Sequence, residues 1–467
     1  MGKILGHFIT PHPPIIIPEI GMGEEDKVIN TVNSMKKIAK DIRELQPDTI
    51  VIITPHGPMF RDAIAISDIE NIKGTFGIFE QPDVKLENNI DVSLTKRIIN
   101  YTLEEDISIA SITNNSEKEY GIVCELDHGS MVPLYYINRE YKDYRIVHIT
   151  YGILSKDELY KFGMIIKQAI LDEDKSAVII ASGDLSHRLS NSGPYEYSPN
   201  GSKFDKQLLT LLESGDTLGV FTMDKDLIEE AGECGLRSFY ILLGIMDTDE
   251  IKGELLSYEG TFGVGYGVLK FITKDGEKES YLEKIIEINK EDIIRKLRSE
   301  DIYVKLARES LNYYLENEEY MPIPENIPED LLNIKRGVFV SFKKEGELRG
   351  CIGTILPTTN NVVFEIIKNS VEAGTKDPRF FPIDNDELDY LEVSVDEIME
   401  PEPATFDSLD PKRYGVIVRS GMRTGLLLPD LEGVDTSAEQ VDISLQKAGI
   451  SKSDKYTLER FEVIRHR

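Results

Sequence analysis

The stretch GHFITPHPP, residues 6–14, joins an apolar segment to a loop in which a histidine lies between two prolines. Proline fixes φ and has no N–H to donate, so this loop can form neither a regular helix nor a central strand. The residues that lead into it, KILGHFIT, are apolar and β-branched and predict a short buried strand. His12 is therefore predicted on a stiff loop at a strand end, where ligands bind in open α/β sheets.

Two other histidines follow apolar strands in the same way. His56 comes after DTIVII in TPHGP, and His187 comes after SAVIIAS in GDLSHRL. A single loop histidine is more often solvated than metal-bound. If the three strands lie side by side, however, their carboxyl ends converge and bring the loops together. The pattern therefore favours a site shared by His12, His56 and His187.

The remaining four histidines lie in different contexts. His128 is part of LDHGSMVPL, which contains glycine and proline and predicts a turn before an apolar segment. His7 and His148 lie inside apolar strands and are expected to be partly buried, with their ring nitrogens satisfied. His466 is expected to be solvated near the end of the chain.

A metal site needs further ligands beside the histidines. Two neutral imidazoles and one carboxylate on one face suit non-haem Fe(II) or a related divalent ion, with positions left open for substrate and oxidant. The carboxylate candidate is Glu233 in GECGLRSF, and the thiol of its neighbour Cys234 is an equally suitable ligand. Adjacent side chains point in different directions, so we expect only one of the two to reach a metal. The competing interpretation is a helix-start carboxylate beside a small buried cysteine.

Composition and charge limit the classes of function. With 40% hydrophobic and 29% charged residues, the 467-residue chain is typical of a soluble globular protein with two or three domains. A formal charge of -30 disfavours nucleic acid and anionic membranes as partners. We expect a cytoplasmic protein, because no apolar run reaches the roughly 18 residues of a membrane span and the N-terminus lacks a secretory signal pattern. Three widely spaced cysteines fit reduced thiols or ligands better than disulfides.

The chain divides into two regions that differ in their pattern of predicted helices and strands. Residues 1–273 alternate strand-like runs with amphipathic helical patterns, which predicts a layered α/β domain with a parallel or mixed sheet. Residues 274–294 are dense in charge, open with an Asp-Gly turn signal and are predicted to be a linker. Residues 295–467 combine hairpin-like strands with two helical patterns and predict a second, α+β domain.

The motifs ITPHPP, TPHGP, LDHGSMVPL, GDLSHRL and GECGLRSF, in this order and spacing, resemble the class III extradiol dioxygenase superfamily, the LigB-like fold that also includes the Memo proteins. The resemblance implies that His12 and His56 hold iron together with a glutamate, here Glu233. Memo-type members have a cysteine in a CGR-like context instead, which Cys234 in CGLR matches. Zinc or another divalent metal is the alternative to Fe(II).

The same resemblance implies roles for the other loop residues. It assigns His187 as acid/base near the open coordination positions and His128 to the substrate pocket. Asp184, three residues before His187, could orient that imidazole, although an aspartate in such a turn is as often a local backbone cap. In this scheme a catecholate or similar ligand would chelate the metal, and His187 would exchange a proton with it.

The second region is similar to the AMMECR family, with LRGCIGT as its most specific motif. Arg349 is the better candidate for an anion contact, whereas Cys351 is more simply explained as a buried hairpin residue than as a catalyst. The pairing of the two domains resembles the fusion in AmmeMemoRadiSam systems, which implies a radical-SAM enzyme as partner.

Three functional hypotheses follow. The first is a metal-dependent oxidoreductase of the extradiol type that acts on a small oxygen-bearing substrate, aromatic or otherwise. The second is a Memo-like scaffold that binds metal or peptide without turnover, and the third is a metal-dependent hydrolase or lyase. The third ligand discriminates the first two, because Glu233 supports the oxygenase and Cys234 supports the Memo type.

Overall fold

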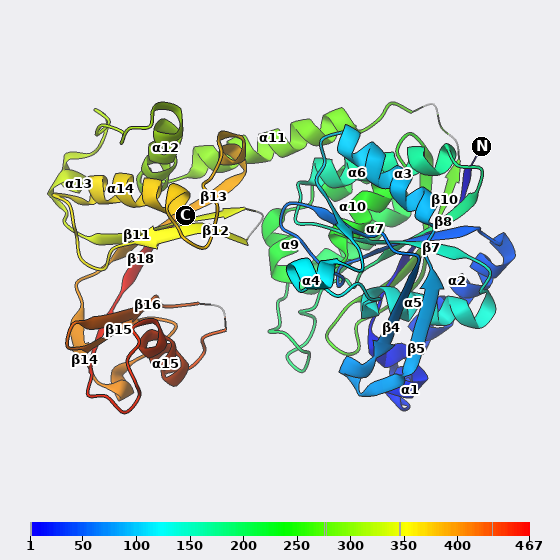
Figure 1. Cartoon of the computed structure of the whole chain (residues 1–467), viewed down its shortest axis with the longest axis horizontal. Coiled ribbons are helices and arrows are strands. Elements are labelled where there is room, and N and C mark those ends of the chain that lie inside the picture. Colours follow the sequence, from blue (N-terminus) through cyan, green and yellow to red (C-terminus); the bar gives the residue numbers. More distant parts are fainter. Residues whose placement is uncertain (1, 275, 277, 345–346, 432) are drawn as a thin grey trace. The chain divides into compact units, whose positions relative to one another are not determined.

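The structure is a computed structural model that describes residues 2–274, 276, 278–344, 347–431 and 433–467 (Figure 1). The chain forms two compact units, residues 1–290 and 291–467. The division lies within the segment 274–294 that we predicted as a linker. The later part of that segment is helical, in α11 (Leu282–Ser299).

An eight-stranded mixed sheet forms the centre of the N-terminal unit, which agrees with the α/β class predicted from sequence. Its strand order is β6 (Ile109–Ile112), β3 (Ile64–Ser67), β7 (Arg145–Thr150), β2 (Thr49–Thr54), β8 (Ser176–Ser182), β1 (Lys3–Thr10), β10 (Tyr266–Lys274) and β9 (Glu250–Glu259). Every residue of β2 and β8 is buried, as expected for parallel strands covered on both faces. A separate hairpin consists of β4 (Asn71–Phe76) and β5 (Gln81–Asn89).

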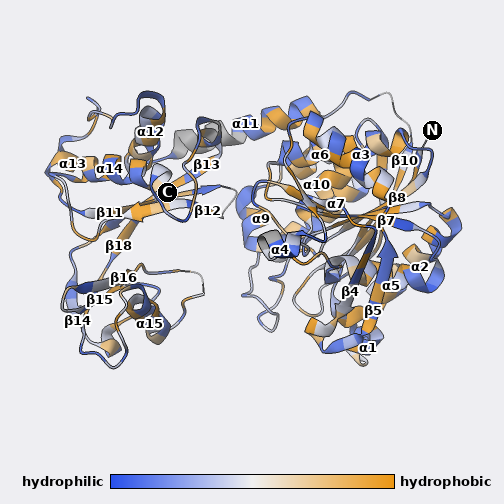
Figure 2. Cartoon of the chain, in the orientation of Figure 1, coloured by the Kyte–Doolittle hydropathy of each residue, from blue (hydrophilic) through white to orange (hydrophobic). Residues whose placement is uncertain are grey.

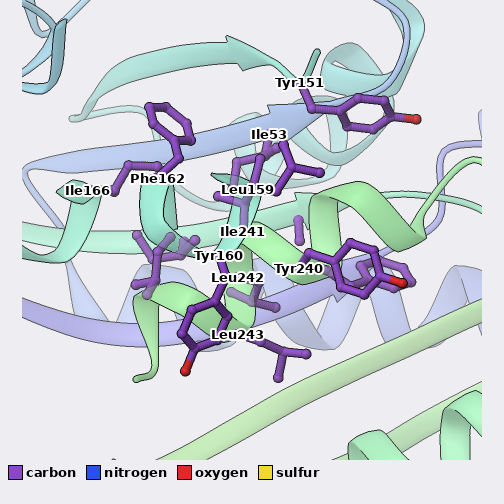
Figure 3. Packing of buried hydrophobic residues seen from close by; sticks show 14 of the residues in the cluster. Ile53, Tyr151, Leu159, Tyr160, Phe162, Ile166, Tyr240, Ile241, Leu242 and Leu243 are labelled. Carbon is purple, nitrogen blue, oxygen red and sulfur yellow. The ribbon is translucent and has the colours of Figure 1, made fainter. Parts of the chain in front are cut away.

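Helices cover both faces of this sheet. One core contains Val51 and Ile53 of β2 together with residues of α3 (Val92–Glu104), α6 (Lys156–Leu171), α7 (Gly201–Ser214) and α10 (Leu236–Ile245). The other contains Ile50 and Ile52 with residues of α2 (Ile29–Leu45) and α5 (His128–Glu140). Figure 3 shows side chains of α6 and α10 from the first core. Successive strand residues thus enter opposite cores, which holds the sheet rigidly between two layers.

Short helices complete the N-terminal unit. They are η1 (Pro14–Ile16), α1 (Pro18–Gly21), η2 (Glu24–Val28), η3 (Gly77–Phe79), α4 (Ser116–Tyr120), α8 (Thr217–Phe221) and α9 (Lys225–Ala231). Among the described residues, no helix is long and apolar enough to cross a membrane. In Figure 2 hydrophobic residues gather around the sheet and α10, inside the unit.

The strand order determines where the predicted site lies. Strands β2, β8 and β1 are neighbours and run parallel, so their carboxyl ends meet at one edge of the sheet. The loops that follow them carry His56, His187 and His12. The convergence that the sequence favoured is therefore present in the fold.

The C-terminal unit contains two four-stranded antiparallel sheets. The first has the order β12 (Glu347–Gly353), β11 (Gly337–Lys344), β13 (Leu391–Ile398) and β18 (Val463–His466), and the second β14 (Glu402–Ala404), β17 (Thr457–Phe461), β15 (Gly415–Ser420) and β16 (Arg423–Leu427). Its helices beyond α11 are α12 (Ile302–Asn317), α13 (Glu329–Asn333), α14 (Val362–Thr375), η4 (Asn385–Tyr390), η5 (Phe406–Ser408) and α15 (Ser437–Lys447). Residues of α12, α14, β11 and β13 form its larger core. This α+β arrangement agrees with the sequence prediction.

Candidate metal centre

His12 is held by its loop in one direction. It follows β1 by two residues between Pro11 and Pro13, and its side chain is 2% exposed. Its backbone N–H donates to the Asp184 carboxylate at 2.9 Å, which ties the loop after β1 to the loop after β8. The flanking prolines have no N–H, so that of His12 is the one backbone donor of this Pro-His-Pro segment.

Three histidine rings meet at the edge of the sheet. One nitrogen from each of His12, His56 and His128 lies within 4.8 Å of the others. The Nε2 atoms of His12 and His56 are 3.0 Å apart, and the His56 and His128 rings stack with centroids 4.1 Å apart. His128 is the first residue of α5 rather than part of the predicted turn, because the Asp127 side chain caps the helix by accepting from Ser130 N.

A proline determines which nitrogen of His12 faces the cluster. Pro133 lies inside α5 and has no N–H for the carbonyl of Gly129, four residues earlier. The Ser182 hydroxyl donates to that carbonyl at 2.6 Å instead. The hydroxyl has only one proton, and that proton is used in this bond. In its 3.0 Å contact with His12 Nδ1, Ser182 must therefore accept, so Nδ1 carries the ring hydrogen. The lone pair of His12 is then on Nε2, the atom that faces His56 and Cys234.

Cys234 reaches one histidine of the cluster, His12. Its Sγ lies 3.6 Å from His12 Nε2 and accepts from the backbone N–H of Asp184 at 3.4 Å. The two loops approach closely because both have glycine at the crossing: a Cβ on Gly183 would lie 2.1 Å from the Cα of Gly235. The thiol is thus brought beside the imidazole by backbone contact.

Glu233 has a different environment from its neighbour. Its carboxylate accepts from Leu236 N at 2.5 Å at the start of α10. This is the helix-start role that we considered as the competing interpretation. Burial raises the pKa of Glu233 despite that bond. Of the two ligand candidates, the structure brings Cys234 to the cluster and leaves Glu233 capping the helix.

His187 lies on the loop after β8 and is not one of the three histidines whose nitrogens converge within 4.8 Å. Its ring stacks on Tyr195 with centroids 5.2 Å apart, and Tyr195 is 53% exposed. We expected Asp184 to orient this imidazole, but its carboxylate bonds the backbone of His12 instead. The reason is that the loop turns back at Gly183, where its backbone N–H donates to Thr10 O, so that Asp184 faces the loop after β1.

Asp127 is a site residue that sequence reasoning missed. It accepts from Thr54 Oγ1 at 2.6 Å, from Ser130 Oγ at 2.9 Å and from His148 Nε2 at 3.0 Å. Burial by itself would raise the pKa of this carboxyl, but these hydrogen bonds outweigh burial and hold the pKa below its usual range. Its place in the LDHG motif, directly before a loop histidine, was the available signal.

The histidines outside the cluster differ from one another. His148 is satisfied, as expected, because Nδ1 bonds Ser67 Oγ at 2.9 Å. His7 corrects the same expectation, because neither of its ring nitrogens has a hydrogen-bond partner among the described residues, and burial lowers its pKa to about 3. His466, which we expected to be solvated, has a side chain that is only 15% exposed and bonds Asp301 Oδ2 at 2.5 Å. The packing of β1, β7 and β18 against distant parts of the chain determined these three environments.

Burial sets the charge state of the cluster. It lowers the pKa of the His12 imidazole well below its usual range, lowers that of His56, and lowers those of His128 and His187 to about 4. All four rings are therefore neutral at pH 7, the form that binds a metal. Burial also raises the pKa of the Cys234 thiol, which would ionise only beside a cation.

The residues present fit a transition metal. The 3.0 Å between the Nε2 atoms of His12 and His56 is the separation expected for nitrogens ~2.1 Å from one ion at about 90°. The 3.6 Å between Cys234 Sγ and His12 Nε2 is compatible with an ion shared by those two atoms, with the sulfur at ~2.3 Å from it. The group whose ligand atoms all lie within 4.8 Å of one another consists of His12, His56 and His128. Imidazole and thiolate suit iron and zinc, whereas calcium and magnesium prefer oxygen ligands.

The C-terminal unit holds the remaining two predicted site residues. Arg349 donates to both oxygens of Glu387, at 2.9 and 2.7 Å, and to the carbonyl of Phe381 at 2.7 Å. The guanidinium thus contacts a carboxylate of the chain itself, and its binding of a separate anion stays a prediction. Cys351 is partly buried, its Sγ accepts from Ser341 Oγ at 3.2 Å, and burial raises its pKa. It therefore has the features of a structural hairpin cysteine.

Comparison with known proteins identifies two families. Residues 6–269 match the family described as the catalytic LigB subunit of aromatic ring-opening dioxygenase, and residues 304–466 match the AMMECR1 family. The first match covers more than half of the chain. Both resemblances seen in the sequence motifs are thereby confirmed.

Individual relatives share these regions. The chain is 51% identical over 465 residues to protein CA_C1420 of Clostridium acetobutylicum, with 99% of each chain covered. It is 47% identical over 168 residues to a protein of Thermotoga maritima, covering 34% of this chain and 97% of that one. The solved structure of protein PH0010 from Pyrococcus horikoshii is 30% identical, covers 35% of this chain and 88% of that chain, and has a TM-score of 0.33. The first match spans both domains.

Proposed function

Because the chain belongs to the family of the catalytic LigB subunit of aromatic ring-opening dioxygenase, we propose that its N-terminal unit is a non-haem Fe(II) dioxygenase for a small aromatic diol or a similar oxygen-bearing substrate. The ligands we assign are His12, His56 and Cys234, with His128 next to them. The observation that carries the proposal is the 3.0 Å pair of Nε2 atoms, with the His12 tautomer set by Ser182.

The proposed reaction balances without a further reductant. The carbon–carbon bond beside the diol breaks, and both atoms of O2 enter the ring-opened product. Bound Fe(II) would supply adjacent positions for O2 and for the substrate oxygens. The same ligands also suit zinc, which would favour hydrolysis or lyase chemistry instead.

The chain's own residues supply proton transfer and exclusion of water. His187 is neutral at pH 7 and can accept the proton that a substrate hydroxyl loses. Tyr195 stacks on that ring and shields one of its faces from water. His128 stacks on His56 at the wall of the adjoining cavity, where it can donate a hydrogen bond to a substrate oxygen.

A second candidate function has its own support. Cys234, rather than Glu233, is next to His12, and this favours the Memo-like alternative of metal or peptide binding without turnover. We also propose a radical-SAM enzyme as partner, on the ground that a LigB and an AMMECR1 domain occur in one chain. Co-expression with such an enzyme and co-purification of the two proteins would test the partnership.

Metal analysis tests the main proposal. The full chain, purified without oxygen, is compared with His12→Ala and His56→Ala, and with His466→Ala in the C-terminal unit as the matched control. About one equivalent of iron in the parent and control, lost in both cluster variants, supports the site. O2 uptake with simple catechols then tests turnover, and bound iron without uptake would favour the scaffold. Zinc would direct attention to hydrolysis, and no metal after reconstitution would refute the dioxygenase.

A further inference from the structure

We propose that the cavity beside the histidine cluster selects aromatic substrates with a cationic side chain, such as an ammonium, and excludes those with a carboxylate. The inference rests on the proposed function for the substrate oxygens at the metal. It adds the charge of the part of the substrate that does not contact the metal. Glu125, at this cavity, is the residue assigned to the cation.

The cavity is large enough for a substituted ring. Its volume is about 380 Å³, within the range of small-molecule sites. His56, His128 and Asp127 line it beside the candidate metal ligands. A molecule bound here would therefore lie against the cluster with one end and extend along the cavity with the other.

Apolar side chains form much of the wall. Phe79 approaches the His128 ring edge-on, with centroids 5.4 Å apart. Met59, Ile78 and Val123 also line the cavity and are 48%, 79% and 50% exposed. Large hydrophobic side chains that gather in water at one cavity indicate a surface that a ligand covers. An aromatic ring with a short alkyl chain is the matching shape.

The charges at the cavity have one sign. Among the described residues that line it, the charged ones are Glu125 and Asp127, and none is lysine or arginine. The Asp127 carboxylate is held by His148 and two hydroxyls, whereas Glu125 is exposed and has no hydrogen bond or ion pair within the described part of the chain. The arginines next to the cluster in sequence, Arg188 and Arg237, are not lining residues.

This one-sided charge gives a specific preference. A carboxylate in the cavity would meet two negative groups and no lysine or arginine that could pair with it, so its binding is opposed by repulsion and desolvation. An ammonium would pair with Glu125. The charge of the metal does not cancel this effect, because the ion would face the imidazoles and the substrate oxygens, with the side chain in the cavity.

A metal-free experiment tests the cavity alone. Binding of phenethylamine, 2-phenylethanol and 3-phenylpropionate to the full chain is measured by ligand-observed NMR. We expect the amine to bind about tenfold more tightly than the carboxylate, with the alcohol between them. Glu125→Gln should reduce this ratio to below about threefold. Glu104→Gln, which removes the same charge at the end of α3, should leave it unchanged. Equal binding of the three, binding of none, or the same ratio in Glu125→Gln would overturn the proposal.

A second experiment separates this inference from the proposed function. Dopamine, 4-ethylcatechol and 3,4-dihydroxyphenylpropionate are titrated without oxygen into metal-loaded protein by calorimetry. If the metal increases the affinity for all three compounds and the amine is not preferred, the dioxygenase proposal stands and the cavity proposal is overturned. If the metal-free protein prefers the amine and the metal adds no affinity, the cavity proposal stands and the dioxygenase proposal is overturned.

Discussion

Replacing Ser182 with alanine should weaken metal binding at the histidine cluster. The hydroxyl is fully buried, donates to Gly129 O at 2.6 Å and accepts from His12 Nδ1 at 3.0 Å. Its removal leaves that carbonyl without a donor, because Pro133 has no N–H to replace it. It also leaves His12 free to take the other tautomer.

Two magnitudes follow from these contacts. An orphaned buried carbonyl lowers the free energy of unfolding by ~1–3 kcal/mol. Loss of the partner that orients a metal-binding histidine reduces metal affinity by roughly 10- to 100-fold, or about 1.4–2.7 kcal/mol. Urea unfolding of the metal-free protein measures the first effect, and competition with a chelator for Co(II) or Zn(II) measures the second.

Ser186→Ala is the matched control. Ser186 is also fully buried, and its hydroxyl donates to the carbonyl of Ala231 at 3.0 Å and accepts from the backbone N–H of Arg188 at 3.1 Å. It makes no hydrogen bond to His12, His56 or His128, all of which the structure describes. It should lose comparable stability and keep its metal affinity. If the two variants lose the same stability and Ser182→Ala binds metal within about twofold of the parent, then Ser182 does not set the His12 tautomer.

Pro133→Ala tests the same set of contacts, from Gly129 O through Ser182 to His12, by restoring the N–H that the helix lacks. The restored N–H can bond Gly129 O within the helix, which frees the Ser182 proton to point at His12 Nδ1. The favoured tautomer then has its hydrogen on Nε2. We expect α5 to be no less stable and metal affinity to fall, a combination that simple helix damage would not produce.

Three further changes have defined outcomes. Cys234→Ser should abolish the near-ultraviolet thiolate-to-metal band of the Co(II)-loaded protein, whereas Glu233→Gln should retain it, and retention in the first variant would place the thiol outside the metal's ligands. Burial raises the pKa of Asp205 from 3.8 to about 6, so the folded protein holds this proton more tightly than the unfolded chain does. The stability that the proton contributes is lost as pH rises through about 6. The free energy of unfolding of Asp205→Asn, measured in urea, should therefore rise by up to about 3 kcal/mol relative to that of the parent between pH 4 and pH 7. A difference between the two proteins that does not change with pH would contradict this. Gly183→Ala should reduce both stability and metal affinity, because its Cβ would lie 2.1 Å from a backbone atom of Gly235 that cannot move aside, and a thermal melt and metal titration like those of the parent would argue against this close approach.

Hydrophobic patterns were sufficient for much of the architecture. The runs TIVIIT and SAVIIAS are continuous and apolar because both faces of those strands are covered, and they predicted both strands correctly. Helices with strong apolar periodicity, such as α6, were also predicted. The helix α5 was missed because Gly129 and Pro133 indicate a turn, and only the Ser182 contact supplies the donor that the helix lacks.

The sequence by itself determined that His12, His56 and His187 each follow a strand, because that information lies in local periodicity and in the loops that stop each strand. Only the tertiary structure decided that these strands are neighbours and which further residues reach the histidines. Cys234 and Glu233 are adjacent, and a contact across 222 positions, through the glycine crossing, brings the thiol to His12 while the carboxylate caps α10. The partners of Asp184, Asp127 and Arg349 were equally hidden. Side-chain direction depends on the packing of distant segments, which no local pattern records.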